Sequence, residues 1–521
     1  MIKVLSSLFF SILSVQFCLA FAEEENDVLI LNKDIYCKKS IDIMPLTNNG
    51  STRLLLFGNK NTIYIDEGVK YYRYNYDYAY VQDLNIEAKD SMKLCRFATV
   101  SYKIENDGYE HEATFVNCLF KNIRFLQPQY DILKFQNCVF DNCNVEICKN
   151  FTDNTNISIV EFEGCTFYNG IANTNNQEML HCDFLGWKSL IKINNCRFIK
   201  NDKKIRSADW IDTYDAVNLS ITNCDFLSES SPTPSSPLIT IKSHSHAIDY
   251  SLAIDTVGYK YGISISNCTF NIYNTEPIVG STGMIISMGD TPRPTSKDSN
   301  QFNVRQTISI HDNMFYLNGK FESTLSFFHI WDGVKDCSIM NNKFIIKSSG
   351  SEKEQFRLLY QSGIDELFGK SYIDGLHVLN NTYISENSYL CGIFRNDLDR
   401  CFENGENKNL ISKNVTIKDN FFKVKGIRPY AKSLPLNISL NPSNRIIDNT
   451  FEVLSESRVY STVCTKESRA FFCSVGCQIY DLDTDQPLWL GNDKKWYNAQ
   501  KTYVEESNLV TVQNEGLVCS E

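Results

Sequence analysis

Apolar and polar residues alternate over short stretches along most of this chain, and each stretch stops at a pair of polar residues. Ile263-Ser-Ile265 and Val415-Thr-Ile417 are typical stretches. Alternation with a period of two predicts strands that bury one face. The apolar residues do not recur at the helical spacing of 3.6, and Thr, Ile, Val and Phe are frequent in these stretches. We therefore predict an all-β protein that consists of many short strands.

The ends of these stretches follow one phrase, which occurs eleven times. It contains an aliphatic or aromatic residue, any residue, a polar residue or Gly, then Cys or Asn, any residue, and Phe or Tyr. Asn, Asp and Gly tolerate left-handed backbone angles, so the middle of the phrase predicts a sharp bend, after which the aromatic residue returns to the interior. The Cys or Asn anchors are Cys118, Cys138, Cys165, Cys196, Cys224, Cys268, Asn313, Asn342, Asn381, Asn420 and Asn449.

Successive anchors lie 20 to 45 residues apart. Spacings in the twenties fit one coil of a parallel β-helix with three strands and three bends, and longer spacings fit a coil that carries a loop. We predict a right-handed parallel β-helix of about eleven coils over residues 106–455. In-register stacking would place the anchors in an internal row of thiols followed by a row of amides. A coil spacing of ~4.8 Å exceeds the ~3.5–4.5 Å between Cβ atoms in a relaxed disulfide, so these thiols are expected to be free.

This part of the chain resembles the right-handed parallel β-helix superfamily, also called the pectin-lyase-like fold. The phrase Asn267-Cys-Thr-Phe270 and its copies are most similar to the polymorphic-membrane-protein-like surface repeats of microbial pathogens and protozoa. The tetrapeptide Gly-Gly-Ala-Ile, which marks the chlamydial members, is absent. The resemblance implies the fold and a surface protein of the adhesin type.

The ends of the chain lack the phrase. Residues 1–22 predict a secretory signal peptide, with Lys3, a largely apolar stretch and Ala20-Phe-Ala22 as the cleavage site. The alternative is a membrane anchor, but the apolar stretch is shorter than the ~20 residues needed to span a bilayer. Residues 23–105 are expected to form an N-terminal cap, and residues 456–521 a C-terminal cap that contains cysteines. No later segment is long and apolar enough to span a bilayer. We therefore expect a secreted protein or one at the extracellular surface.

Secretion would affect the cysteines and asparagines. Removing the signal peptide leaves 18 of the 19 cysteines, an even number that suits an oxidising compartment. The expected disulfides involve Cys37, Cys95, Cys464, Cys473, Cys477 and Cys519, and the last four allow three pairings. The expected glycosylation sites are Asn49, Asn150, Asn156, Asn218, Asn414 and Asn437, whereas Asn267 and Asn380 also begin acceptor triplets but lie inside the phrase, close to the core.

Charge and motifs exclude several classes of function. A net charge of −11 and a pI near 5.3 argue against binding nucleic acid or anionic membranes. There is no P-loop, dinucleotide-binding motif or Gly-x-Ser-x-Gly motif. Asp481–Asp485 begins like a calcium loop, but Gln486 and Asn492 replace its required Gly and Glu. Cys473 and Cys477 have no nearby His for a zinc site. We expect neither a cofactor nor a metal.

Two groups of residues could act on carbohydrates. The catalytic candidates, an acidic cluster followed by two histidines, are Asp209, Asp212, Asp215, His244 and His246. Because residues one coil apart stack side by side, these groups could supply an acid and a base on one outer face. The expected binding residues are Tyr72, Tyr74, Tyr76 and Tyr78, which alternate on one strand face together with Tyr80, and Trp210 as a sugar platform. The alternatives are solvated charges on the outer face and a tyrosine wall packed over the first coil.

Three hypotheses follow. The first is a non-catalytic secreted or surface protein for adhesion, which binds a glycan or cell-surface partner through its loops. The second is a polysaccharide lyase or glycoside hydrolase that acts on acidic glycans with the Asp/His cluster. The polygalacturonase signatures are absent, and Trp210-Ile-Asp212 matches pectate lyases only up to Thr213, where that family has His. The third is a structural component of a wall or coat.

Overall fold

The computed structural model divides the 521-residue chain into two compact units. Unit 1 comprises residues 1–230 and 251–260, and unit 2 comprises residues 231–250 and 261–521. The structure describes residues 26–38, 41–43, 53–66, 71–74, 78–89, 96–97, 112–123, 125–126, 132–148, 159–170, 178–183, 190–201, 210–214, 218–229, 239–243, 262–278, 283–290, 305–321, 324–330, 333–348, 355–361, 372–396, 411–427, 445–454, 463–464, 478–481, 486–490, 493, 495–498, 500 and 503–506. All secondary structure assigned in these residues is β-strand.

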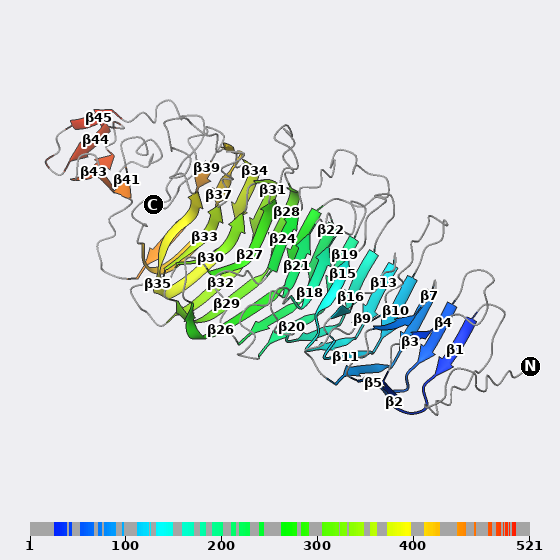
Figure 1. The fold of residues 1–521 in the computed structure, drawn as a ribbon. Helices are drawn as coiled ribbons and strands as arrows, with labels where there is room; N and C mark the ends of the chain where they lie inside the picture. The colour runs from blue at the N-terminus through cyan, green and yellow to red at the C-terminus, as the bar shows by residue number, and fades with distance from the viewer. Residues whose placement is uncertain are drawn as a thin grey trace, which may run out of the picture. The chain divides into compact units, whose positions relative to one another are not determined.

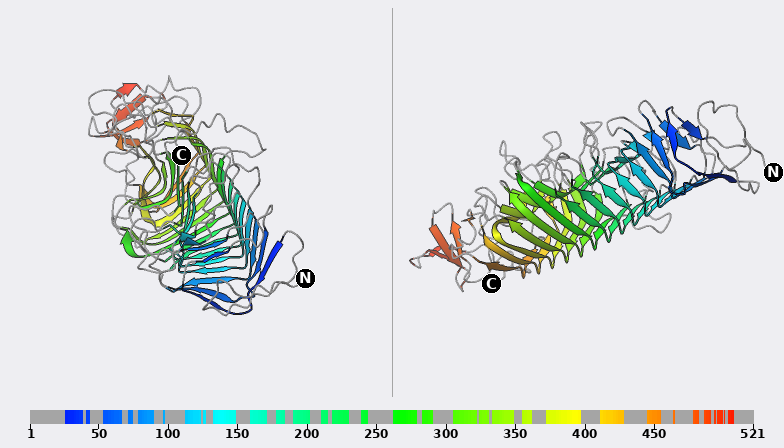
Figure 2. Two further views of the ribbon diagram at one scale, coloured as in Figure 1. Left: turned by 45° about the vertical axis from the view of Figure 1, so that its right-hand side comes forward. Right: turned by 90° about the horizontal axis from the view of Figure 1, so that it is seen from below.

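Unit 1 consists of parallel strands in three rows, and each coil from β1–β3 to β19–β21 contributes one strand to each row (Figure 1). The first row is β1 (Asn26–Ile30), β4 (Arg53–Phe57), β7 (Tyr78–Gln82), β10 (Glu112–Val116), β13 (Ile132–Gln136), β16 (Ile159–Glu163), β19 (Leu190–Asn194) and β22 (Asn218–Thr222). The second is β2 (Ile35–Cys37), β5 (Thr62–Ile65), β8 (Asn85–Ala88), β11 (Leu119–Lys121), β14 (Val139–Asp141), β17 (Thr166–Tyr168), β20 (Arg197–Lys200) and β23 (Asp225–Ser228). The third is β3 (Ile41–Ile43), β6 (Tyr71–Tyr74), β9 (Arg96–Phe97), β12 (Phe125–Leu126), β15 (Val145–Cys148), β18 (Leu180–Asp183) and β21 (Ile211–Tyr214). Figure 2 shows these strands, blue to green, stacked one behind another.

Unit 2 repeats this arrangement with longer strands. Its first row is β25 (Gly262–Ser266), β28 (Arg305–His311), β31 (Gly333–Met340), β34 (Tyr372–Leu379), β36 (Ile411–Lys413), β37 (Thr416–Lys418) and β39 (Arg445–Ile447). Its second is β26 (Thr269–Ile278), β29 (Met314–Phe321), β32 (Lys343–Ser348), β35 (Thr382–Asn396), β38 (Phe421–Ile427) and β40 (Thr450–Val453), and its third is β24 (Ile239–Ser243), β27 (Gly283–Asp290), β30 (Thr324–Ile330) and β33 (Gln355–Gln361). The predicted fold, an all-β right-handed parallel β-helix, is confirmed.

A five-stranded sheet follows the last coil. It consists of β41 (Val463–Cys464), β42 (Gln478–Asp481), β43 (Gln486–Leu490), β44 (Lys495–Asn498) and β45 (Tyr503–Glu506). The first two strands pair in parallel, and the remaining pairs are antiparallel. This pattern differs from the fully parallel coils, and it lies in the region where the sequence predicts a C-terminal cap.

The N-terminal region differs from the predicted cap over residues 23–105. Strands β1 to β9 all precede the first copy of the phrase, yet they pair in parallel in the same three rows. Strand β7 then pairs with β10, residue by residue from Tyr78↔Glu112 to Gln82↔Val116. A coil therefore needs the alternating apolar pattern but not the complete phrase, and counting phrases does not count coils.

The bend inside the phrase has the predicted backbone geometry. The residue before each anchor lies in the left-handed region, with φ between 52° and 63°: Asn117, Asn137, Gly164, Asn195, Asn223, Asn267, Asp312, Asn341, Asn380, Asp419 and Asp448. Asn and Asp tolerate this conformation better than other residues that have a Cβ atom. Gly164 is the one glycine in the set, and a Cβ there would lie 2.5 Å from Oδ1 of Asn137. The predicted bend is confirmed.

Aromatic side chains beyond the bend form stacks inside each unit. In unit 1 the rings of Phe120, Phe140, Phe167, Phe198 and Phe226 stack on successive coils at centroid distances of 4.5–5.3 Å. In unit 2 the stack is Phe270, Phe315, Phe344, Tyr383 and Phe422 at 4.5–4.6 Å. All ten side chains are buried, as the sequence predicts for this position. Burial of these rings removes apolar area from water and so stabilises the coils.

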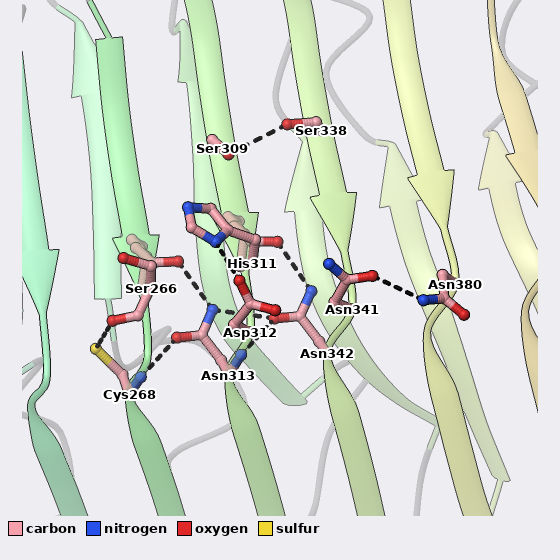
Figure 3. A network of polar contacts seen from close by, with 12 residues as sticks. Ser266, Cys268, Ser309, His311, Asp312, Asn313, Ser338, Asn341, Asn342 and Asn380 are labelled. Carbon is pink, nitrogen blue, oxygen red and sulfur yellow. Dashed lines mark hydrogen bonds and ion pairs between the residues drawn. The ribbon is translucent and has the colours of Figure 1, made fainter.

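The anchor side chains form two different hydrogen-bonded rows. In unit 1 the thiol of Cys165 donates to the carbonyl of Phe135 at 3.4 Å, and the thiol of Cys196 accepts from the backbone N–H of Cys165 at 3.4 Å. In unit 2 Nδ2 of Asn342 donates to Oδ1 of Asn381 at 3.0 Å and to the carbonyl of Ile310 at 2.9 Å. Figure 3 shows the preceding step of this row, in which Nδ2 of Asn313 donates to Oδ1 of Asn342. The same amide pattern continues through Asn420 to Asn449. All eleven anchor side chains are buried.

Ten cysteines whose side chains the structure describes carry free thiols. These buried residues are Cys37, Cys118, Cys138, Cys143, Cys165, Cys182, Cys196, Cys224, Cys268 and Cys337. The expected disulfide of Cys37 is therefore wrong, because this side chain points into the core of its coil, opposite Ile65 of the next strand. Cys95, Cys473, Cys477 and Cys519 lie outside the described residues, as does the side chain of Cys464, so their pairing stays a prediction.

Candidate functional site

Trp210 lies immediately before β21 and is completely buried. Its ring lies 5.1 Å from the ring of Phe226, at an interplanar angle of 44°. A sugar platform must present a ring face to solvent, so the structure contradicts that prediction for Trp210. The physical reason is that the apolar ring fills the interior between two coils.

Asp212 is the one predicted catalytic residue that the structure describes. Asp209, Asp215, His244 and His246 lie outside the described residues. Asp212 lies in β21, opposite His181 of β18 in the parallel register, and its Oδ2 is 3.7 Å from Nδ1 of His181. The residue is only 4% exposed. The imidazole beside Asp212 is thus His181, which was not among the predicted site residues.

A third ionisable group, Glu178, completes this cluster. Glu178, His181 and Asp212 each offer one potential ligand atom, and these three atoms lie within 4.8 Å of one another. The sequence did contain a signal for two of them: His181 follows the anchor Cys165 by 16 residues, and Asp212 follows the anchor Cys196 by 16 residues. Residues with equal offsets in adjacent coils occupy equivalent positions when the intervening chain has the same length.

The burial of Asp212 limits what the cluster can do to a polymer. Glycoside hydrolysis needs two carboxylates on either side of an accessible bond. A carboxylate that is 4% exposed offers no such access in this conformation. The cluster does bring two carboxylates and an imidazole together, which is a donor set for a divalent cation.

The predicted tyrosine face is divided between two strands. Tyr72 and Tyr74 lie in β6, the third strand of one coil, whereas Tyr78 lies in β7, the first strand of the next coil. Tyr76 lies outside the described residues. The prediction that residues 72–80 form one strand face is therefore wrong, because the chain passes from the third row to the first row within this segment. Tyr78 points outward, and the guanidinium of Arg53 lies 4.8 Å from its ring centroid.

An aromatic pair that the sequence analysis missed lies on the second row of unit 1. Tyr36 of β2 and Tyr64 of β5 are opposite each other in the register, and their rings stack at 4.8 Å with an interplanar angle of 17°. Tyr36 is 59% exposed. The signal was the alternation in Ile35-Tyr-Cys37 and Ile63-Tyr-Ile65, where the flanking residues are buried and the tyrosines point outward.

The expected glycosylation sites have different surroundings. Asn218 is 4% exposed in β22, so the folded coil leaves no room for a glycan on its side chain, and the prediction for this residue is wrong. Asn414 is exposed and stays a prediction. Asn49, Asn150, Asn156 and Asn437 lie outside the described residues. Asn267 and Asn380, expected to lie close to the core, have exposed side chains, because the left-handed bend turns them outward.

Comparisons with known proteins do not assign a family. No protein-family model matches the sequence, and no curated protein matches it. Among solved structures, tailspike protein 3 of bacteriophage CBA120 is similar at 10% identity and a TM-score of 0.30. The similarity covers 92% of this chain but 63% of the tailspike chain. At this TM-score the similarity carries no argument about function, and the fold assignment rests on the strand pairing described above. Within the described ranges, no helix is long and apolar enough to cross a bilayer.

Proposed function

We propose that this chain is a secreted or surface-displayed, non-catalytic β-helix protein that binds a neutral glycan through Tyr36 and Tyr64. The observation that carries the proposal is the exposure of Tyr36, whose ring stacks on Tyr64 with one face. Tyr36 is one of only two large hydrophobic side chains found exposed among the described residues. Among the described residues, Tyr36 lies on the first strand of its row, which pairs only with the strand of Tyr64, so its second ring face is directed away from the stack.

Polar side chains continue the row that begins with this aromatic pair. The parallel register places Glu87, Lys121 and Asp141 on the following coils, one after another. Lys121 also forms an ion pair with Glu87 at 3.3 Å. With ~4.8 Å between coils, the row from Tyr36 to Asp141 spans about 19 Å, which is long enough for several sugar rings. Sugars bind where an aromatic face contacts the ring and polar groups hydrogen-bond its hydroxyls.

The net charge indicates which glycans fit. A protein with a net charge of −11 repels polyanionic chains at long range. The row itself carries both signs of charge, and its carboxylates and ammonium group can hydrogen-bond neutral hydroxyls. A neutral polysaccharide therefore suits this surface better than a uronate polymer. The loops that the sequence analysis favoured for binding lie largely outside the described residues.

Replacing Tyr36 with Ala is expected to weaken glycan binding by about tenfold, equivalent to ~1.4 kcal/mol. The reason is the loss of the exposed ring face, while the buried neighbours Ile35 and Cys37 stay in place. Affinity electrophoresis of the purified chain in gels that contain neutral or acidic polysaccharides measures this change. Tyr273→Ala in unit 2, which removes a half-exposed tyrosine from β26, is the matched control.

Three results would contradict the proposal. The first is that no glycan in the gel slows the migration of the chain. The second is that Tyr36→Ala is slowed as much as the unchanged chain, and the third is that Tyr273→Ala loses as much glycan binding as Tyr36→Ala. The same incubations also test the alternative function. Release of unsaturated products or reducing ends that disappears in Asp212→Asn would replace the binding proposal with a lyase or hydrolase.

A further inference from the structure

We propose that Glu178, His181 and Asp212 bind one divalent transition-metal ion of the Zn²⁺ type in unit 1. The site lies on the third strand row and involves neither Tyr36 nor Tyr64. It is therefore independent of the glycan-binding proposal. The sequence alone predicts no metal site, because these three residues come from two coils and only one of them belongs to the acidic cluster at residues 209–215.

The backbone fixes the positions of two of the three ligands. Strands β18 and β21 pair in parallel, with Leu180↔Ile211 and Cys182↔Thr213 on either side of the pair His181↔Asp212. The N–H of Leu180 also donates to the carbonyl of Trp210 at 3.1 Å. Because the residue pairs before and after His181 and Asp212 are also aligned, these two residues cannot move apart without breaking hydrogen bonds between the strands. The imidazole and the carboxylate are therefore held side by side.

The distances suit ligands that share one ion. Nδ1 of His181 and Oδ2 of Asp212 are 3.7 Å apart, which is long for a hydrogen bond. Two ligand atoms at ~2.1 Å from a tetrahedral Zn²⁺ lie about 3.4 Å from each other. The ligand atoms of all three residues lie within 4.8 Å of one another. A small rotation of the side chains would therefore bring them to metal-binding distances.

The electrostatics of the cluster favour a cation. The side chain of Asp212 is 5% exposed and that of His181 is 12% exposed, so water solvates them poorly. Glu178 brings a second carboxylate close to the first. Two neighbouring carboxylates repel each other, and burial strengthens this repulsion. One divalent ion would balance both negative charges and use the neutral imidazole as a ligand.

The donor atoms select the metal. Ca²⁺ takes six to eight oxygen ligands and Mg²⁺ retains most of its water, so a single imidazole with two carboxylates suits neither ion. Zn²⁺ binds His nitrogen and carboxylate oxygen, and three protein ligands leave one position for water. Cys182 is next to His181 in the sequence, but its side chain points to the opposite face and is buried in the core. The site should therefore have nitrogen and oxygen ligands without sulfur.

Titration with Zn²⁺ alone tests the proposal. The purified chain is treated with a chelator, dialysed and titrated by calorimetry, and its thermal unfolding is followed with and without Zn²⁺. We expect saturable binding and an upward shift of the unfolding midpoint. Glu178→Gln should weaken this binding at least tenfold and remove the shift of the unfolding midpoint, because it replaces a carboxylate ligand with a neutral amide. Glu178 precedes β18, so this substitution leaves the strand pairing intact. Glu161→Gln, a half-exposed glutamate paired with Lys192 on the first row, is the matched control and should bind as the unchanged chain does.

Cysteines elsewhere in the chain could also bind zinc, and Co²⁺ distinguishes the two cases. A site of nitrogen and oxygen ligands gives weak visible bands without intense sulfur-to-metal charge transfer. We expect the weak bands to disappear in both Glu178→Gln and Asp212→Asn, with circular dichroism showing whether each variant folds. Three outcomes would overturn the proposal: no Zn²⁺ binding, binding that Glu178→Gln leaves intact, or a spectrum dominated by thiolate bands.

Discussion

Replacing Asn342 with Asp is expected to lower the free energy of unfolding by about 3–5 kcal/mol at neutral pH, as when a buried polar network loses one partner. The amide of Asn342 is buried in the middle of the row. Its Oδ1 accepts from the backbone N–H and the Nδ2 of Asn313, both at 3.0 Å. Its Nδ2 donates to Oδ1 of Asn381 and to the carbonyl of Ile310. A carboxylate retains the first pair of bonds but places a negative oxygen against two acceptors.

The destabilisation should depend on pH in a defined direction. Burial and the two facing acceptors raise the pKa of the carboxyl that Asn342→Asp introduces in the folded state, because both disfavour its charged form. A carboxyl whose pKa is higher in the folded than in the unfolded state costs no stability while it is protonated at acid pH. Stability is lost as the pH rises from the unfolded-state pKa through the folded-state pKa. The unfolding midpoint in urea, followed by circular dichroism, should therefore recover partly at low pH. Asn271→Asp, on the outward side of β26, is the control, and an equal loss in both variants would contradict the prediction.

Alkaline pH is expected to destabilise the chain by several kcal/mol through its buried thiols. Burial raises the pKa of the Cys37 thiol from 9.0 to about 11 and the pKa of the Cys337 thiol from 9.0 to about 12. Each unit of difference corresponds to ~1.4 kcal/mol between the folded and unfolded states. The stabilisation is complete below pH 9 and is lost as pH rises through 11 and 12, because the unfolded chain releases its protons first.

The contribution of one thiol can be measured by difference. Cys337→Ala removes a titrating group from the core position opposite Ile308, and Lys and Tyr residues titrate equally in both proteins. The variant is less stable at pH 8 because of the cavity. The difference from the unchanged chain should shrink as pH rises from about 9 to 12. Urea unfolding under reducing conditions at several pH values measures this difference, and a constant gap would show that the thiol does not couple folding to pH.

The sequence was sufficient for features that depend on local chemistry. Asn267 and Gly164 could be predicted at bends because few residues adopt a left-handed backbone, and Phe198 could be predicted inside because it follows the bend at a fixed distance. The buried position of the anchors follows from the same alternation. These inferences need no knowledge of how far one coil is from the next.

The sequence was insufficient where the length of a whole coil decides whether a side chain points into the core or toward solvent. Trp210 lies in a segment between one bend and the next coil, and the anchor spacings show that such segments vary in length from coil to coil. Whether such a side chain points inward or outward depends on the register of the third row. His181 and Asp212 are an exception, because equal offsets from their anchors could have placed them together. Glu178 precedes β18, so no strand register predicts its position.

The asparagine row has an electrical polarity. From Asn313 to Asn420, each amide oxygen accepts from the preceding coil, and one N–H of each amide donates to the oxygen of the next asparagine, ending at Asn449. The other N–H of each amide donates to a carbonyl of the preceding coil. Bond dipoles in such a series add head to tail, as peptide dipoles do in a helix, and neighbouring bonds polarise one another. The interior of unit 2 therefore carries partial negative charge at the end near Cys268 and partial positive charge at the end near Asn449. A chain segment that closes the latter end is stabilised if it presents an acceptor.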